Sequence, residues 1–191
     1  MITEKPVESS AELVLRAIEA LSEKAFLPII GSEKGKFLAE EIRLARPKHV
    51  LEVGTLIGYS AILMGKELDA DAEIVTIEIH RGEAEQAGNN IAKAVISAKV
   101  KIIKGNALHI IPTLQGIFDF AFIDAEKTEY LQYLHLAEPK LRAGAVVFAD
   151  NAGRFADQMS DYLNYVRNSG RYRSRYIGVG DDGVEISVKL T

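Results

Sequence analysis

The stretch Val50-Leu51-Glu52-Val53-Gly54-Thr55-Leu56-Ile57-Gly58-Tyr59-Ser60 (VLEVGTLIGYS) decides the fold. It joins a short apolar strand, His49–Val53, through a glycine-containing turn to a helix predicted near Tyr59–Leu68. In an open α/β sheet, a ligand binds where such strands end. A dinucleotide-binding turn would need glycine where Leu56 stands, and no Gly-Lys-Ser/Thr phosphate loop follows. The turn therefore predicts a ligand site and disfavours NAD and FAD.

On both sides of this stretch, apolar strands alternate with amphipathic helices. The further strands are predicted at Ile74–Ile79, Val100–Lys104, Phe118–Ile123 and Ala145–Ala149. The helices between and after them are predicted near Arg81–Ala98, Glu129–Leu141 and Phe155–Asn168. Nearly continuous apolar strands indicate a parallel sheet that is covered on both faces. The fold class is therefore α/β, open and doubly wound.

The two ends of the chain depart from this alternation. Two helices are predicted before the first strand, at about Ser9–Lys24 and Ser32–Ala45, and Leu13, Leu15, Ile18 and Leu21 are expected to share one face of the first. This face would cover the core, form a dimer contact or act as a substrate lid. At the other end, Tyr172–Val179 and Val184–Leu190 flank Gly180-Asp181-Asp182-Gly183, which predicts an antiparallel hairpin.

Composition excludes several classes of protein. The chain has 191 residues, 48% hydrophobic and 26% charged, which is typical of a globular domain. Its 23 basic and 27 acidic residues give a net charge of −4, so general attraction to nucleic acid or to an anionic membrane is not expected. The absence of cysteine excludes disulfides and thiol chemistry. We expect a cytoplasmic protein, since no secretory signal and no apolar stretch of membrane-spanning length occurs.

Acidic residues mark the first ligand site. Glu52 lies just before the glycine turn. Glu78 lies near the end of the next strand, where a carboxylate would accept hydrogen bonds from both ribose hydroxyls. Two acids at adjacent strand ends suit a ligand with a cationic amino-acid part and a nucleoside without phosphates. The alternative is that both are solvated acids beside an ordinary strand–helix turn.

A second group of oxygen ligands is predicted at the same edge of the sheet. Asp124 ends one strand, and Asp150 and Asn151 end the next. Two carboxylates and an amide oxygen, with no histidine or cysteine beside them in the sequence, suit Mg²⁺ or a similar divalent cation. Isolated acids are common at strand ends, so the spacing alone leaves this metal site open.

The whole pattern resembles the S-adenosylmethionine-dependent methyltransferases. Glu52, Gly54 and Gly58 match their first motif, Glu78 matches the second, and Gly105-Asn106-Ala107 matches the segment that borders the adenine. The resemblance implies a single domain over residues 1–191, with a helical extension (1–46) and a Rossmann-like core (47–191) of seven strands, the last antiparallel. It also implies cofactor contacts from Tyr59, Ser60 and Asp124.

Together, both groups resemble the catechol and caffeoyl-CoA O-methyltransferases, and in particular their small prokaryotic relatives. These enzymes hold a divalent metal with residues matching Asp124, Asp150 and Asn151, and use a base matching Lys127. The resemblance implies methyl transfer to a hydroxyl of a small, catechol-like acceptor and assembly as a homodimer. Leu56 and Ala125-Glu126 depart from the catechol enzyme, which has an aromatic residue and a His-Trp pair there, so the acceptor stays open.

Two other functions stay under consideration. Some relatives methylate hydroxyuridine in tRNA, and Arg171, Arg173 and Arg175 would line one face of a strand as a phosphate track. The alternative for these arginines is a solvated edge strand that charge protects against aggregation. The second function is that of a non-catalytic nucleotide-binding subunit, which would have no use for Asp124, Lys127 and Asp150 together. Among the four histidines, His109 is expected nearest the adenine.

Overall fold

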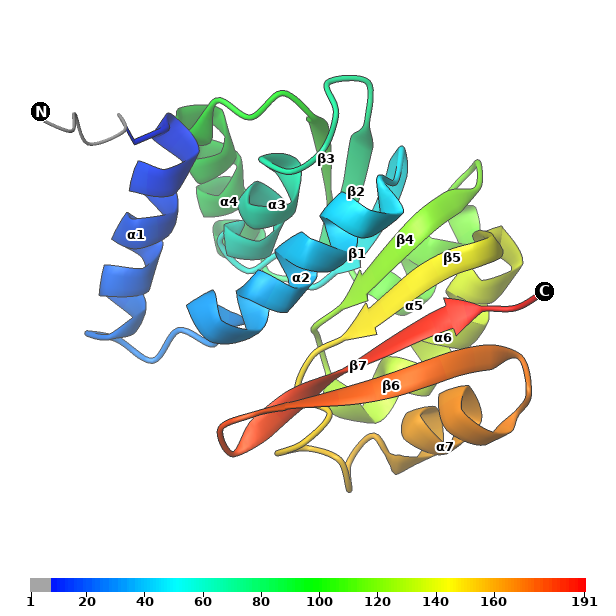
Figure 1. The fold of residues 1–191 in the computed structure, drawn as a ribbon. Coiled ribbons are helices and arrows are strands. Elements are labelled where there is room, and N and C mark those ends of the chain that lie inside the picture. Colours follow the sequence, from blue (N-terminus) through cyan, green and yellow to red (C-terminus); the bar gives the residue numbers. More distant parts are fainter. Residues whose placement is uncertain (1–7) are drawn as a thin grey trace, which may run out of the picture.

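The computed structural model describes residues 8–191 and contains a seven-stranded sheet with helices on both faces (Figure 1). The strand order is β3-β2-β1-β4-β5-β7-β6. The strands are β1 (His49–Val53), β2 (Glu73–Glu78), β3 (Lys99–Lys104), β4 (Phe118–Ile123), β5 (Leu141–Ala149), β6 (Tyr172–Val179) and β7 (Asp182–Lys189). Strands β1 to β5 pair in parallel, and β7 pairs antiparallel with both β5 and β6. The predicted fold class, including the antiparallel C-terminal hairpin, is confirmed.

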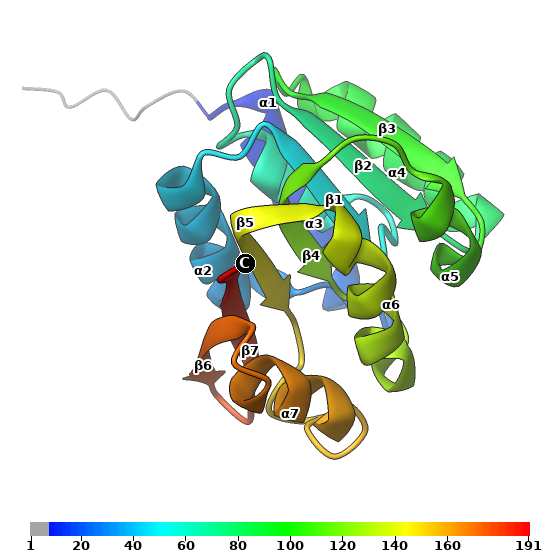
Figure 2. The same cartoon turned by 90° about the vertical axis from the view of Figure 1, so that its right-hand side faces the viewer.

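Seven α-helices cover the sheet in the described part of the chain. They are α1 (Ser10–Ser22), α2 (Gly31–Ala45), α3 (Tyr59–Gly65), α4 (Arg81–Ala94), α5 (Ala107–Ile110), α6 (Tyr130–Ala137) and α7 (Ser160–Asn168). Short 3₁₀ turns occupy Ile111–Thr113, Lys127–Glu129 and Glu138–Lys140. Figures 1 and 2 show α1 to α4 on one face of the sheet and α5 to α7 on the other.

Alternation along the strands builds a separate core on each face. In β4, Phe120 and Phe122 pack with the residues of α1 to α3, whereas Ala121 and Ile123 pack with those of α6 and α7. Successive side chains of a strand point to opposite faces, so a strand that is covered on both sides must be apolar throughout. This is why FDFAFI contains one charged residue, Asp119, near its start, where it accepts hydrogen bonds from the backbone of Lys48 and His49.

The first helix differs from its predicted packing. Ser9 and Glu12 cap its N-terminus with reciprocal hydrogen bonds, and Leu15 and Ile18 are buried together with Ala11. Leu13 and Leu21, which were expected on the same face, are 55% and 42% exposed. The physical reason for Leu13 is that two residues along a helix correspond to about 200°, so it lies opposite Ala11 and Leu15. Helix α1 packs on α3 and α4 and forms an outer layer.

Several boundaries also shift. The helix predicted near Glu129–Leu141 is broken into 3₁₀ turns at both ends of α6, the second of which contains Pro139. Strand β5 begins at Leu141 instead of Ala145, and α7 begins at Ser160 because residues 152–159 form turns. The hairpin turn is shorter than predicted, since Asp182 already pairs with Val179. No helix among residues 8–191 is long and apolar enough to cross a membrane.

Candidate active site

One cavity of about 940 Å³ opens at the carboxyl ends of the parallel strands. It lies where the strand order reverses between β1 and β4, which is where an open α/β sheet places its ligand. The lining combines the two groups of residues that the sequence singles out. From the predicted set these are Gly54, Tyr59, Ser60, Glu78, Gly105, Asn106, Ala107, Asp124, Lys127, Asp150 and Asn151.

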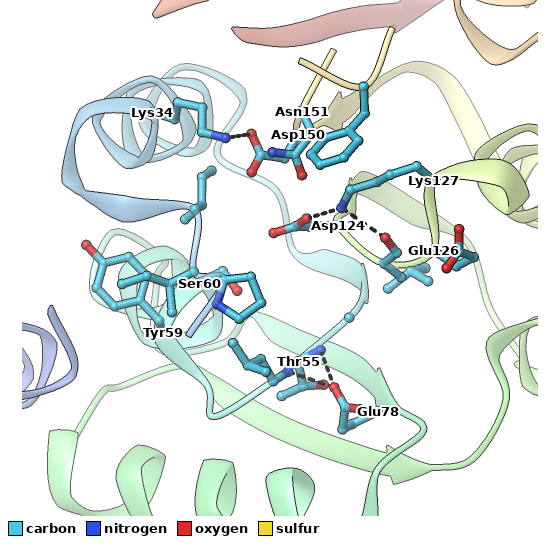
Figure 3. Close-up of a pocket in the computed structure, with 18 of the residues that line it drawn as sticks. Lys34, Thr55, Tyr59, Ser60, Glu78, Asp124, Glu126, Lys127, Asp150 and Asn151 are labelled. Atoms are coloured by element: carbon cyan, nitrogen blue, oxygen red, sulfur yellow. Dashed lines mark hydrogen bonds and ion pairs between the residues drawn. The ribbon is translucent and has the colours of Figure 1, made fainter. Parts of the chain in front are cut away.

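The loop after β1 is held by its two neighbouring strands. Gly54 has a φ of +97°, and a Cβ there would lie 2.0 Å from the carbonyl oxygen of Asp124, so no other residue fits. Glu78, at the end of β2, accepts hydrogen bonds from the amides of Thr55 (3.1 Å) and Leu56 (2.7 Å) through one oxygen. Its other oxygen accepts from the amide of His80 at 2.9 Å. The carboxylate therefore shapes the loop and also faces the cavity (Figure 3).

Two members of the predicted cofactor set do not line the cavity. Glu52 is fully buried beneath the loop, where it accepts a 2.5 Å hydrogen bond from the hydroxyl of Ser60, and burial raises the pKa of Glu52 to about 7. Gly58 starts α3 with a φ of +88°, and a Cβ there would lie 3.3 Å from Ala87 of α4. The geometry gives both residues a supporting role: Glu52 orients Ser60, and Gly58 lets two helices pack closely.

The remaining cofactor candidates line the cavity, but the histidine on its wall is not the one that the sequence predicts. Asn106 caps α5 by accepting a 2.8 Å hydrogen bond from the amide of Leu108. Tyr59 reaches away to α1, where its hydroxyl donates to Glu19 at 2.5 Å. His80, and not His109, is the histidine on the cavity wall, because it lies two residues after the end of β2 at the sheet edge.

The second group gathers its side chains as predicted. Asp124 and Asp150 follow β4 and β5 and face each other across the cavity (Figure 3). Burial and repulsion from Asp124 raise the pKa of Asp150 to about 7. The Lys127 ammonium donates to Asp124 (3.0 Å) and to the carbonyl of Ala125 (2.9 Å), with the Phe155 ring centroid at 6.0 Å.

Two charged residues at this group were missed in the sequence. The Lys34 ammonium, from α2, lies 2.6 Å from Asp150 and 2.8 Å from Asp182, at the start of β7. Lys34 and Asp182 are 148 residues apart. Nothing in the local sequence spacing indicates that the two side chains contact each other. The only signal in the sequence is the position of Asp182 in the predicted hairpin turn, where an aspartate is also typical of the turn itself.

The arginines near β6 do not share one face. Arg171 precedes the strand and pairs with Glu138 at 3.1 Å, beside α6. Arg175 forms an ion pair with Glu41 of α2, which covers the opposite face of the sheet. Arg173 is exposed. Two of the three side chains of the proposed phosphate track are thus used to join β6 to its neighbours.

Comparison with known proteins agrees with this geometry. A family model described as O-methyltransferase matches residues 8–167. A catechol O-methyltransferase of Niastella koreensis is 35% identical over 157 residues, which is 78% of this chain and 71% of the relative. A catechol O-methyltransferase of Mycobacterium tuberculosis is 36% identical over 143 residues, or 73% of this chain and 65% of the relative.

A solved structure matches almost the whole chain. The O-methyltransferase from Streptomyces achromogenes that is involved in tomaymycin synthesis, determined in complex with S-adenosylmethionine, has a TM-score of 0.83 and 26% identity, covering 99% of this chain and 93% of that one. The class is therefore that of the S-adenosylmethionine-dependent O-methyltransferases. The chain belongs to the O-methyltransferase family whose model it matches.

Proposed function

We propose that this chain transfers a methyl group from S-adenosylmethionine to a hydroxyl of a small, catechol-like acceptor with the help of a divalent metal ion. The observation that carries the proposal is that Asp124, Asp150 and Asn151 line the same cavity as Gly54 and Glu78. Residues that would hold the methyl donor and residues that would hold a metal beside the acceptor hydroxyl thus share one cavity. A cavity of about 940 Å³ is at the upper end of the usual range for small-molecule sites, which suits two ligands.

For the cofactor, the family resemblance and the lining together suggest an orientation. The methionine part would lie over the loop Gly54–Ser60, with the hydroxyl of Ser60 available to its charged end. The ribose would meet Glu78, and the adenine would lie near Gly105-Asn106-Ala107. In this orientation the sulfonium would lie toward Asp124, because β1 and β4 are neighbours in the sheet.

The residues present fit a divalent cation. Asp124 and Asp150 are two oxygen ligands that repel each other in a mostly buried setting, and the only cation that residues 8–191 place on Asp150 is the Lys34 ammonium, 2.6 Å from its Oδ1. Asn151 adds an amide oxygen, which completes a donor set suited to Mg²⁺. When bound, such a cation lowers the pKa of coordinated hydroxyls.

The side chains then have separate tasks in the reaction. The cavity aligns the acceptor oxygen behind the methyl group, and Lys127 in its neutral form would accept the hydroxyl proton at Nζ. The new oxygen–carbon bond forms as the carbon–sulfur bond breaks, and S-adenosylhomocysteine is the leaving group. Apolar side chains at the mouth, among them Phe26, Pro28 and Phe155, suit a flat aromatic acceptor.

The experiment is label transfer from methyl-labelled S-adenosylmethionine to a panel of catechols and to unmodified tRNA, each with Mg²⁺ and with a chelator. We expect label in a small diphenol that the chelator abolishes. Label that persists under chelation would refute the metal, and label in tRNA alone would refute the small acceptor. No methyl transfer in any arm, with cofactor binding intact, would refute this acceptor class.

A further inference from the structure

Lys34 is an unusual charge for the first turn of α2, because it lies mostly buried between two carboxylates. Its side chain is 12% exposed, and those of Asp150 and Asp182 are 2% and 11% exposed. Its ammonium lies 2.6 Å from Asp150 and 2.8 Å from Asp182, so it forms an ion pair with each. These two ion pairs fix the ammonium between the ends of β5 and β7, and Figure 3 shows the one with Asp150.

Asp182 collects four donors at the start of β7. It accepts from Lys34 (2.8 Å), from the side-chain amide of Asn151 (2.8 Å) and from the backbone amides of Gly153 (3.3 Å) and Arg154 (2.9 Å). Both oxygens of Asp182 are acceptors in these hydrogen bonds, and one of them forms an ion pair with the Lys34 ammonium. An ionised carboxylate only accepts hydrogen bonds, so every group that faces it must be a donor.

This fixes the orientation of Asn151. Since Asp182 requires a donor, the amide nitrogen of Asn151 must face it, and the amide oxygen is left for another partner. The same lysine that pairs with Asp182 also contacts one oxygen of Asp150. Asp150 and Asn151, the two proposed metal ligands that follow β5, thus both contact the Lys34–Asp182 ion pair.

We propose that Lys34 and Asp182 are positioning residues that hold Asp150 and Asn151 in the arrangement that binds the divalent cation. This inference rests on the metal site of the proposed function. It extends that function, because Lys34 connects the proposed metal ligands to α2. The residues that lead into α2, Pro28–Gly31, also line the cavity.

A simpler view, in which Lys34 acts only through its charge, predicts the opposite result. An ammonium 2.6 Å from Asp150 repels a divalent cation at that carboxylate, so its removal would tighten metal binding. If Lys34 positions the ligands, its removal weakens metal binding. The two views therefore differ in the sign of one measured change.

The test measures Mn²⁺ binding without cofactor or acceptor, from the free-ion signal in electron paramagnetic resonance. Lys34→Met removes the charge and keeps the length, and the double variant Lys34→Met/Asp182→Asn removes one charge of each sign. The matched control is Lys36→Met, two residues further along the same helix and exposed. Thermal unfolding and metal-free S-adenosylmethionine affinity check that each variant is folded.

We expect the dissociation constant for Mn²⁺ to rise by about 10-fold or more in both Lys34 variants, as is usual when a residue that hydrogen-bonds to a metal ligand is replaced. It should stay unchanged in the control. Equal or tighter Mn²⁺ binding by Lys34→Met, or unchanged binding by the double variant, would overturn the positioning role and leave the proposed function intact. Absence of Mn²⁺ binding in the unmodified protein would overturn the metal in the proposed function and this inference with it.

Discussion

Replacing Gly54 by alanine tests the contact between the loop after β1, which is predicted to hold the cofactor, and Asp124, one of the proposed metal ligands. The new Cβ would lie 2.0 Å from the carbonyl oxygen of Asp124, which is backbone and cannot rotate away. An L-residue at this positive φ costs roughly 1–2 kcal/mol, and forcing an extra carbon into a packed site costs a further 1–3 kcal/mol or so. We expect Gly54→Ala to lower the free energy of unfolding by about 2–5 kcal/mol, a decrease in Tm of about 5–15 °C for a chain of this size.

The assay is thermal unfolding with and without S-adenosylmethionine, together with cofactor affinity by calorimetry. The stabilisation by cofactor should also decrease, because the loop that carries Thr55 and Ser60 is displaced. Gly82→Ala is the matched control: Gly82 lies in α4, nothing lies within 4 Å of its added Cβ, and alanine favours the helix by about 0.5–1 kcal/mol. A decrease of less than about 2 °C in Gly54→Ala with normal cofactor affinity would refute the reasoning.

Three further variants test separate parts of the site. Lys127→Ala should reduce turnover by about 100-fold while cofactor affinity is kept, and unchanged turnover would remove Lys127 from the mechanism. Burial raises the pKa of Glu52 from 4.5 to about 7, so the folded protein binds this proton more tightly than the unfolded chain does. The stabilisation from protonated Glu52 is therefore full below pH 4.5 and is lost as the pH rises to 7. Glu52→Gln should therefore gain stability relative to the unmodified protein from pH 5 to pH 8, by up to about 3 kcal/mol, and a pH-independent difference in Tm would contradict this. Tyr59→Phe removes the hydrogen bond to Glu19 and should cost about 1 kcal/mol in denaturant unfolding; no loss would mean that this bond does not hold α1.

The parts of the site that follow strand ends could be predicted from the sequence. Asp124 and Asp150 each come directly after an apolar strand, and parallel strands end at one edge of the sheet, so local pattern alone brings them together. Gly54 likewise follows β1, and Glu78 is the last residue of β2, so the pattern places both at the same edge. The resemblance to a known family then added roles that spacing could not supply.

The parts that depend on tertiary packing could not be predicted in this way. Lys34 reaches Asp182 only because α2 packs across the sheet beside β7, and helix periodicity does not specify that position. Glu52 has the right sequence position for a cofactor contact, but the loop above it closes over its carboxylate. Leu13 was misassigned because counting apolar residues without their angles merges two faces of one helix.

The register of the sheet explains why one fold can keep its chemistry while its acceptor varies. Val53 pairs with Ile123, and Ile123 pairs with Ala149, so the residues that follow them are also neighbours. Backbone hydrogen bonds extend this order past the strand ends, from Asp124 to Val53 (2.9 Å) and from Asp150 to Ile123 (3.1 Å). Neighbouring strands lie about 4.8 Å apart, so the sheet itself fixes the spacing between the donor loop and the proposed metal ligands. The mouth of the cavity has no such constraint: Phe26 lies in the connection between α1 and α2 and is 97% exposed. Changes there should therefore alter the acceptor KM and leave metal binding unchanged.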